Sequence, residues 1–352
     1  MAVKAIALLS GGLDSTLAVK LMLDQGIEVV ALNFMTPFCN CTAKSSSCKH
    51  EAVRVAREFG IPIRVRYKGM EYLKIVENPK HGYGRGLNPC IDCRIFMHRE
   101  AKALMEEEGA KFLVTGEVLG QRPMSQRRPV LKLIERESGT EGLVLRPLSA
   151  HHFEPTIPER EGWVDREKLL AIRGRSRKEQ IRLAEDLGVT DYPCPAGGCL
   201  LTDPDFAAKL KDLFEHKPDY DLKDVRLLRV GRHFRLRPGL KVVLGRNQGE
   251  NEALERSADA GSTLVRGATF KGPTALLREP ATAEDLALVG RMLLRYAHQP
   301  RGEIRVEVRG AGDETAAGAP PLPVQGPLDD GALGRLRIGH AEGPRAACGS
   351  GR

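Results

Sequence analysis

Short apolar runs alternate with longer amphipathic segments through the first 115 residues, and this alternation constrains the fold more than any other feature. The apolar runs predict buried strands at residues 3–9, 28–34, 61–67 and 111–115. The segments between them predict helices over residues 17–26, 49–59 and 94–107. Because strands that alternate with helices pair in parallel, we predict an α/β fold, a doubly wound parallel sheet with helices on both faces.

The length and the charge of the chain limit its class and its partners. The chain has 352 residues, enough for about two domains, and carries 54 Lys and Arg against 46 Asp and Glu, a net charge of +8. This positive balance favours a polyanionic partner, nucleic acid first. No apolar stretch approaches the roughly 18 residues of a membrane span, and the first run is too short for a secretion signal. We therefore expect a cytoplasmic protein that does not enter a membrane.

The composition changes after Pro204, and we predict three regions: a catalytic domain at 1–205, a small α/β module at 218–310 and a tail at 311–352. The tail is rich in Gly, Ala and Pro and holds no aromatic residue, so we predict that it is disordered. The module contains an acid-free window whose basic side chains are candidates for RNA binding, although a solvated surface is the alternative. These side chains are Arg226, Arg229, Arg232, Arg235, Arg237, Lys241 and Arg246.

A glycine-rich string at residues 10–15 (SGGLDS) joins the first predicted strand to the first predicted helix. The glycines allow a tight turn whose backbone amides face an anion, and a helix N-terminus favours phosphate. Asp14 is a candidate ligand for Mg²⁺ on that phosphate. Since no Gly-Lys-Ser/Thr follows at the required spacing, the string is not a Walker A motif, and it is not a dinucleotide fingerprint either.

In this position the string resembles the pyrophosphatase loop of the N-type ATP pyrophosphatases, the PP-loop enzymes. These enzymes release pyrophosphate from ATP and transfer AMP to an oxygen of the substrate. The resemblance implies an adenine nucleotide alpha hydrolase-like fold, ATP and Mg²⁺ as cofactors, and Asp14 as a catalytic metal ligand. It also implies an ATP-binding set that consists of Ser10, Gly11, Gly12, Asp14, Ser15, Thr115 and Gly116.

Two further strings select among the PP-loop families. Residues 114–121 (VTGEVLGQ) resemble the tRNA 4-thiouridine synthetases, and residues 88–94 (NPCIDCR) are similar to the tRNA-specific 2-thiouridylases. The resemblance covers about residues 1–205 and implies an ATP-dependent tRNA sulfurtransferase, which adenylates a uridine carbonyl oxygen and replaces it with sulfur. The partners it implies are tRNA and a sulfur donor: a cysteine desulfurase, a sulfur carrier or free sulfide. The basic module is similar to a small RNA-binding module of other RNA-associated proteins.

Two other functions stay open beside this hypothesis. The 7-cyano-7-deazaguanine synthases share the loop and make an amide or a nitrile, but they carry clustered cysteines near the C-terminus, which this chain lacks. A non-catalytic metal- and RNA-binding protein is the second alternative. The intact Asp14 and Ser15 argue against it.

Three cysteines are candidates for the sulfur chemistry: Cys90 and Cys93, which precede a predicted helix, and Cys199, which follows a glycine-rich turn. Two arrangements are open. In one, a cysteine carries a persulfide and a second cysteine resolves it, with Cys93 and Cys199 as the catalytic residues. The other is implied by thiolases that have a Cys-x-x-Cys pair and one distant cysteine: all three hold a [4Fe-4S] cluster whose free iron carries the sulfide, with Cys194 as an alternative ligand.

Cys39, Cys41, Cys48 and His50 form a second group with the composition of a zinc site. Its spacings are tighter than those of most structural zinc sites. The alternatives are an active-site loop with free thiols and an incidental cluster. Cys348 stands alone in the tail, and we assign it no role.

Overall fold

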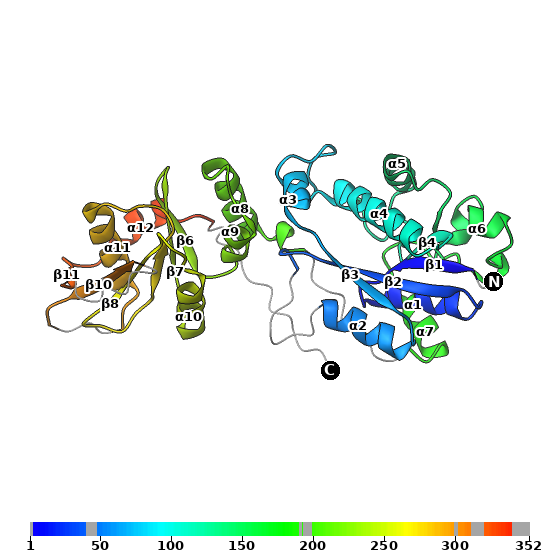
Figure 1. The fold of residues 1–352 in the computed structure, drawn as a ribbon, viewed down its shortest axis with the longest axis horizontal. Coiled ribbons are helices and arrows are strands. Elements are labelled where there is room, and N and C mark those ends of the chain that lie inside the picture. The colour runs from blue at the N-terminus through cyan, green and yellow to red at the C-terminus, as the bar shows by residue number, and fades with distance from the viewer. Residues whose placement is uncertain are drawn as a thin grey trace. The chain divides into compact units, whose positions relative to one another are not determined.

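The computed structural model describes residues 3–39, 48–189, 192, 199–298, 302–310 and 320–339. The chain divides into two compact units, which we call the N-terminal unit (Met1–Thr202) and the C-terminal unit (Asp203–Arg352). Each unit has its own sheet, and both are drawn in Figure 1. In the described part of the chain, no helix combines the length and the apolar character that crossing a membrane requires.

A five-stranded parallel sheet forms the centre of the N-terminal unit, in the order β3-β2-β1-β4-β5 (Figure 1). Its strands are β1 (Lys4–Leu8), β2 (Glu28–Met35), β3 (Ile63–Tyr67), β4 (Phe112–Thr115) and β5 (Val144–Leu145). In the central strand, Ala5 lies opposite Val29 on one side and Phe112 on the other. The four predicted strands are therefore confirmed, and the order of the sheet reverses between β1 and β4, where ligands of such sheets bind.

Helices cover both faces of this sheet, because the central strands are apolar on both sides, whereas the edge strand β3 alternates apolar residues with Arg64 and Arg66. On one face α1, α2 and α7 enclose a core with Leu17, Val55 and Ala184, and on the other face α4 packs Leu104 against Ile6. The helices are α1 (Leu13–Leu23), α2 (Cys48–Glu58), α3 (Met70–Glu77), α4 (Cys90–Glu107), α5 (Arg128–Ser138), α6 (Ile157–Arg160) and α7 (Lys178–Asp186), with short 3-10 turns η1 (Ala150–His152), η2 (Arg166–Lys168) and η3 (Leu200–Thr202). The predicted doubly wound arrangement is confirmed.

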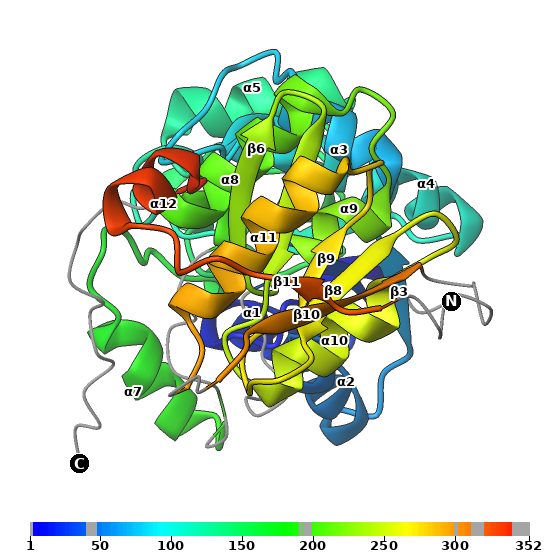
Figure 2. The same ribbon diagram turned by 90° about the vertical axis from the view of Figure 1, so that its left-hand side faces the viewer.

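The C-terminal unit is built on a six-stranded sheet in the order β11-β10-β8-β9-β7-β6, and all of its pairs are antiparallel. Its strands are β6 (Arg232–Arg237), β7 (Leu240–Leu244), β8 (Thr263–Gly267), β9 (Ala275–Leu277), β10 (Arg305–Gly310) and β11 (Leu322–Pro323). Its helices are α8 (Pro204–His216), α9 (Leu222–Leu227), α10 (Gln248–Ser257), α11 (Ala283–Arg295) and α12 (Asp330–Leu336). Figure 2 shows α11 crossing the sheet, where Met292 packs on Val265, whereas Leu254 of α10 packs against Val243 in a separate cluster.

The structure differs from the predicted disordered tail over residues 320–339. This segment forms β11 and α12, and Leu328 and Leu333 are buried in the core of the C-terminal unit. The prediction used the average Gly, Ala and Pro content of the region. An average does not show that two single leucines are buried and stabilise the segment. The C-terminal unit begins at residue 203, close to the predicted end of the catalytic domain at 205. Residues 206–217, which the prediction assigned to neither region, lie mostly in α8.

Candidate active site

The predicted phosphate loop connects β1 to α1 at the carboxyl edge of the parallel sheet. The hydroxyl oxygens of Ser10 and Ser15 lie 3.0 Å apart, and Ser15 Oγ donates to the Gly12 carbonyl at 2.9 Å. Gly12 is the N-cap residue of α1, and among the described residues no side chain caps this helix end. The first amides of α1 are therefore available to an anion, as a phosphate site requires.

Two glycines of the predicted ATP-binding set allow backbones to approach closely around the loop. A Cβ on Gly116 would lie 2.5 Å from the backbone of Asp14 and Ser15, so only glycine lets the segment after β4 reach the loop. Gly11 has a φ of +79°, and a Cβ there would lie 2.6 Å from the Ala52 nitrogen of α2. These contacts hold the loop between β4 and α2.

Asp14 faces two groups that the sequence did not single out. Its Oδ2 accepts a hydrogen bond from Gln121 Nε2 at 2.7 Å and lies 3.5 Å from the Arg177 guanidinium. Its Oδ1 is buried and has no hydrogen-bond partner among the described residues. An unsatisfied buried carboxylate oxygen beside a phosphate loop fits a ligand of Mg²⁺.

A buried acid links the loop to the cysteine helix. Glu117, next to Gly116, accepts a hydrogen bond from Arg146 Nε at 3.1 Å and from the Thr115 hydroxyl at 3.3 Å, and its other oxygen lies 3.5 Å from Arg94 Nε. Burial alone would raise the pKa of Glu117, but Arg94 and Arg146 lower it to about 2. This ion pair fixes the start of α4, where Arg94 follows the second cysteine, beside the phosphate loop.

Cys90 and Cys93 lie within the first turns of α4, whereas we predicted that the helix begins after them. The helix begins at Cys90 because Pro89 serves as its N-cap and the Cys93 amide already donates to the Pro89 carbonyl at 2.8 Å. Both sulfurs are therefore at a helix N-terminus, where the backbone dipoles favour a thiolate.

Cys199 reaches the same edge of the sheet through backbone hydrogen bonds of its neighbours. The Leu200 amide donates to the Phe38 carbonyl at 2.9 Å, and the Leu87 amide donates to the Leu201 carbonyl at 2.9 Å. Cys199 Sγ also lies 3.6 Å from the Phe38 carbonyl oxygen, to which it donates. The segment that carries Cys199 is thus held between the end of β2 and the loop that precedes Cys90.

The three sulfurs have different electrostatic environments. Burial, and then the neighbouring Cys93, raises the pKa of Cys90, and burial raises that of Cys199 to about 12. Burial would also raise the pKa of Cys93, but the charge and the hydrogen bond of Lys68 lower it below the ordinary thiol value. Lys68 Nζ donates to Cys93 Sγ at 3.0 Å. Of these three thiols, Cys93 is the one that the structure stabilises as a thiolate.

The donor chemistry of this cluster fits an iron-sulfur group better than a single metal ion. Over the residues that the structure describes, no three His, Cys, Asp or Glu side chains converge closely enough to hold one ion. Burial raises the pKa of Tyr72, and Cys93, Cys199 and Cys90 all lie near enough to its hydroxyl to raise it further. Because a four-iron cluster is wider than one ion, its ligands stand further apart, and hydrogen bonds to the sulfurs tune it.

The predicted zinc group lies partly outside the described residues. Cys41, like the alternative cluster ligand Cys194 and the tail Cys348, falls outside them, and of Cys48 only the backbone is described. His50 is exposed on α2, whereas Cys39 is half-buried and close enough to Cys199 to raise its pKa. Cys39, unlike the exposed His50, therefore lies near Cys199.

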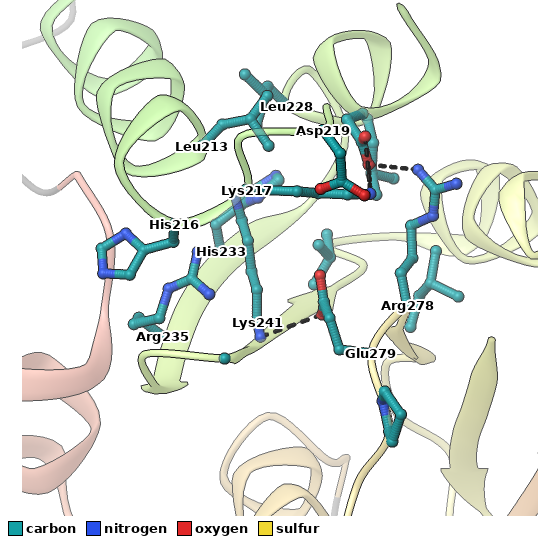
Figure 3. Close-up of a pocket in the computed structure, with 16 residues that line it drawn as sticks. Leu213, His216, Lys217, Asp219, Leu228, His233, Arg235, Lys241, Arg278 and Glu279 are labelled. Carbon is teal, nitrogen blue, oxygen red and sulfur yellow. Dashed lines mark hydrogen bonds and ion pairs between the residues drawn. The ribbon is translucent and has the colours of Figure 1, made fainter. Parts of the chain in front are cut away.

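The acid-free window of the C-terminal unit is not acid-free in space. Asp212 of α8 accepts from Arg235 at 2.7 Å and lies 3.3 Å from Lys241 Nζ. Arg235 and Lys241 line a pocket of about 380 Å³ together with Lys217 and Arg278 (Figure 3).

The other basic residues of the window lie nearer to solvent. Arg237 pairs with Asp285, Arg246 pairs with Glu250, and the Arg232 guanidinium lies 4.4 Å above the centre of the Tyr296 ring. Arg226 and Arg229 are exposed.

Sequence reasoning did not name Lys68, Arg122 or Arg177, and it quoted Gln121 only as the end of the 114–121 string, without a role in the site. Desolvation and Arg94 lower the pKa of Arg122, whereas Cys90 and Asp14 raise it, so this guanidinium is near enough to both of them to interact with their charges. A signal existed for Lys68, because it directly follows β3 at the edge of the sheet where ligands bind. No local signal marked Arg122 or Arg177, which belong to irregular segments.

Comparison with known proteins matches each unit to a different family. Residues 1–156 match the family model for the thiamine biosynthesis protein ThiI, and residues 231–323 match that for the NFACT protein RNA binding domain. The resemblance of the first unit to tRNA thiolation enzymes, and that of the second to an RNA-binding module, are thereby confirmed.

Individual relatives carry names of the same kind. The tRNA-specific 2-thiouridylase MnmA of Leptospira interrogans is 30% identical over 118 residues, which cover 29% of this chain and 31% of the relative. The probable tRNA sulfurtransferase of Methanothermobacter thermautotrophicus is 31% identical over 147 residues, which cover 41% and 36%. The chain thus spans about a third of the length of these relatives. A solved 4-thiouridine synthetase–RNA complex with bound ATP is 27% identical, with a TM-score of 0.34 and coverage of 53% of this chain and 51% of that one.

Proposed function

We propose, on the premise that residues 1–156 match the ThiI family, that the protein is an ATP-dependent tRNA sulfurtransferase that makes thiouridine. The main support is the Glu117–Arg94 ion pair, which joins the segment packed on the phosphate loop to the helix that carries Cys93. An adenylating loop and a sulfur site at one sheet edge are what oxygen-to-sulfur exchange needs, because both steps act on the same carbon of the base.

In the first step, a uridine carbonyl oxygen attacks the α-phosphate of ATP, and pyrophosphate leaves. The open amides at the start of α1 stabilise the negative charge that develops on the departing group, and Arg177 lies beside them. Asp14, whose buried Oδ1 has no hydrogen-bond partner among the described residues, would hold Mg²⁺ on the phosphates. The product is an adenylated uridine, in which AMP is a good leaving group.

In the second step, a sulfur nucleophile attacks the activated carbon, and AMP leaves with the former carbonyl oxygen. In the persulfide route Cys93 would carry this sulfur, because Lys68 Nζ donates to Cys93 Sγ at 3.0 Å. Arg122, whose charge interacts with those of Asp14 and Cys90, is a candidate to hold the phosphate of AMP.

Cys90, Cys93 and Cys199 would hold the [4Fe-4S] cluster of this proposal. When bound, such a cluster offers one iron that has no protein ligand and can carry the sulfide. Anaerobically purified protein should then contain about four irons per chain. The competing persulfide route requires no iron, and zinc at the Cys39 group would appear in the same metal analysis as a separate element.

The C-terminal unit would hold the tRNA, in keeping with its match to an RNA-binding domain. Arg226, Arg229, Arg237 and Arg246 are the better candidates among the seven basic residues because they are exposed, whereas Arg235 and Lys241 are half-buried beside Asp212. Such contacts would act on the phosphate backbone and give a salt-dependent affinity.

The test combines pyrophosphate release with nucleoside mass spectrometry of the tRNA. The wild type should release pyrophosphate when bulk tRNA and a sulfur donor are present, and thiouridine should form in step with it. Asp14→Ala should abolish both, whereas Asp24→Ala, which removes an exposed carboxylate from the end of α1, should retain both. Pyrophosphate release that does not depend on tRNA, or near-normal turnover by Asp14→Ala, would contradict the proposal.

A further inference from the structure

Two irregular segments of the N-terminal unit lie side by side at the carboxyl edge of its sheet. Residues 119–128 lead from β4 to the start of α5, and residues 171–178 lead to the start of α7. The segments pair at one point as a parallel bridge, where the Gly174 amide donates to the Leu119 carbonyl at 2.7 Å. Because backbone hydrogen bonds join them, the two segments form one surface.

Side chains attach this surface to the rest of the unit. The His152 ring donates to the Ala171 carbonyl at 2.7 Å, and the His152 carbonyl accepts a hydrogen bond from Arg128 at 2.6 Å. At the other end, Gln121 donates to Asp14 of the phosphate loop at 2.7 Å. The surface therefore directly adjoins the loop that the proposed function assigns to ATP.

Five exposed cations belong to this surface, and we call them the basic patch: Arg127, Arg128, Arg173, Arg175 and Lys178. Neither segment contains Asp or Glu. Within the part of the chain that the structure describes, no carboxylate forms an ion pair with any of the five cations. Their neighbour Arg177 does have one, with Asp14 at 3.5 Å. The patch thus carries positive charge that no contacting carboxylate neutralises.

The exposed arginines of β3 show a different arrangement. Arg64 lies 2.7 Å from Glu108, and Arg66 lies 2.9 Å from Glu107. A pair of opposite charges is neutral as a whole, whereas like charges that lie together repel one another. The basic patch is therefore suited to a partner that brings negative charge, and the arginines of β3 are not.

The extent and the composition of the patch indicate what kind of anion it fits. The patch reaches from the start of α5, which packs on α4, to the start of α7, which packs on α1, and these helices cover opposite faces of the sheet (Figure 1). Four of its five members are arginines, whose planar guanidinium donates two parallel hydrogen bonds to a phosphate. A nucleic-acid backbone repeats its phosphates along its length and can contact several of these cations at once.

We propose that the basic patch binds the sugar-phosphate backbone of the tRNA on the N-terminal unit itself and positions the target uridine at the phosphate loop. The identity of the RNA rests on the proposed function, whereas the position and the charge of the patch do not. Contacts of this kind orient an RNA without reading its sequence. The patch contributes to tRNA affinity in addition to the C-terminal unit and takes no part in binding free ATP.

The experiment measures the affinity of the full-length protein for fluorescently labelled bulk tRNA, without ATP, at several salt concentrations. Combining Arg127→Ala, Arg173→Ala and Arg175→Ala should weaken binding at least about tenfold and reduce the slope of log affinity against log salt by about 2 to 3, because three phosphate contacts are lost. Replacing the same three arginines by lysine keeps the charge and should retain most of the affinity and of the slope.

A matched control removes three exposed cations from the opposite edge of the same sheet. Arg57 and Arg136 lie in the last turns of α2 and α5, and Lys111 directly precedes β4. Combining Arg57→Ala, Lys111→Ala and Arg136→Ala should leave the affinity for tRNA close to that of the wild type. Equal affinities and slopes for the wild type and the triple variant of the patch overturn the proposal, and so does an equal loss in the control.

Two further measurements distinguish tRNA from other anionic partners. Calorimetric titration should give the same ATP affinity for the triple variant of the patch as for the wild type, and a loss of ATP affinity assigns these arginines to the nucleotide and overturns the proposal. Thiouridine formation that falls while tRNA affinity stays unchanged assigns the patch to an acidic sulfur-donor protein and also overturns it. If the wild type binds tRNA but makes no thiouridine, the proposed function fails, and the affinities of the variants still decide the role of the patch.

Discussion

Each unit contains a largely buried lysine, and the two lysines have different counter-charges. Lys241 of the C-terminal unit lies 3.3 Å from Asp212, a carboxylate that also accepts two hydrogen bonds from Arg235. Lys68 of the N-terminal unit lies 3.0 Å from Cys93 and is otherwise surrounded by aromatic rings. A carboxylate is a permanent anion at neutral pH, whereas a sulfur changes its charge and its bonding partners.

A lysine paired with a carboxylate stabilises the fold, whereas a lysine paired with a sulfur lies beside a reactive group. Asp212 pairs with both Arg235 and Lys241, so this group stabilises the junction of α8 with the sheet. The Lys68 group is completed by a reactive atom, so it is poised for chemistry. The four predictions below test this contrast, from the largest expected effect to the smallest.

Asp212→Ala should destabilise the C-terminal unit by about 3–5 kcal/mol, because it leaves Arg235 and Lys241 without their buried carboxylate. Denaturant unfolding followed by a probe in that unit measures the change. The control is Asp330→Ala, which removes an exposed partner of Arg295 and should cost at most about 1 kcal/mol. ATP affinity, a property of the N-terminal unit, should not change. Similar losses from both substitutions would contradict the structural role of Asp212.

The stability of the C-terminal unit should rise between pH 8 and 10.5. Burial lowers the pKa of Lys241 to about 8, against an ordinary value of 10.5, so within this window the unfolded chain binds a proton that the folded chain does not. Stability therefore increases with pH, by up to about 3 kcal/mol, and the effect is absent below pH 8, where both states are protonated. Lys241→Met should lack this rise, and an identical pH profile in that variant would refute the assignment.

Gly116→Ala should weaken ATP binding by about 100-fold, since its Cβ would lie 2.5 Å from the backbone of the phosphate loop. Gly231→Ala is the matched substitution in the other unit: its φ is +73°, and its Cβ would lie 2.5 Å from the Leu244 carbonyl oxygen. It should destabilise the C-terminal unit and leave ATP affinity intact. Calorimetric titration with ATP measures the affinity of both variants. Weaker ATP binding by Gly231→Ala but not by Gly116→Ala would contradict the assignment of ATP binding to the N-terminal unit.

The smallest effect concerns tRNA binding and salt. Replacing the exposed Arg226 by Ala should weaken binding uniformly and reduce the slope of log affinity against log salt by about 1, as the loss of one phosphate contact predicts. Arg235→Lys keeps the charge beside Asp212 and should leave the slope unchanged. If the salt dependence of tRNA affinity is the same in both variants, Arg226 does not contact an RNA phosphate in the way that its exposure predicts.

Local patterns were sufficient for the fold of the N-terminal unit. Four strands, the glycine-rich loop and the helix over 94–107 were predicted from residues that lie close together in the sequence, because burial on both faces makes the central strands continuously apolar. The start of α4 was predicted four residues late. Pro89 is the N-cap, so Cys90 and Cys93 already belong to the helix. In the tail, two buried leucines outweighed a composition typical of disorder.

The sequence by itself determined which chemical groups are present: a phosphate loop at the edge of the parallel sheet, a cysteine pair at the start of a helix, and a basic second unit. Only the tertiary structure decided which charges are available. Lys68 meets Cys93 across 25 positions of the chain, and Asp212 meets Arg235 across 23. The energy of a buried charge depends on the partner within a few ångströms, and that partner comes from another element, so no window of sequence contains both.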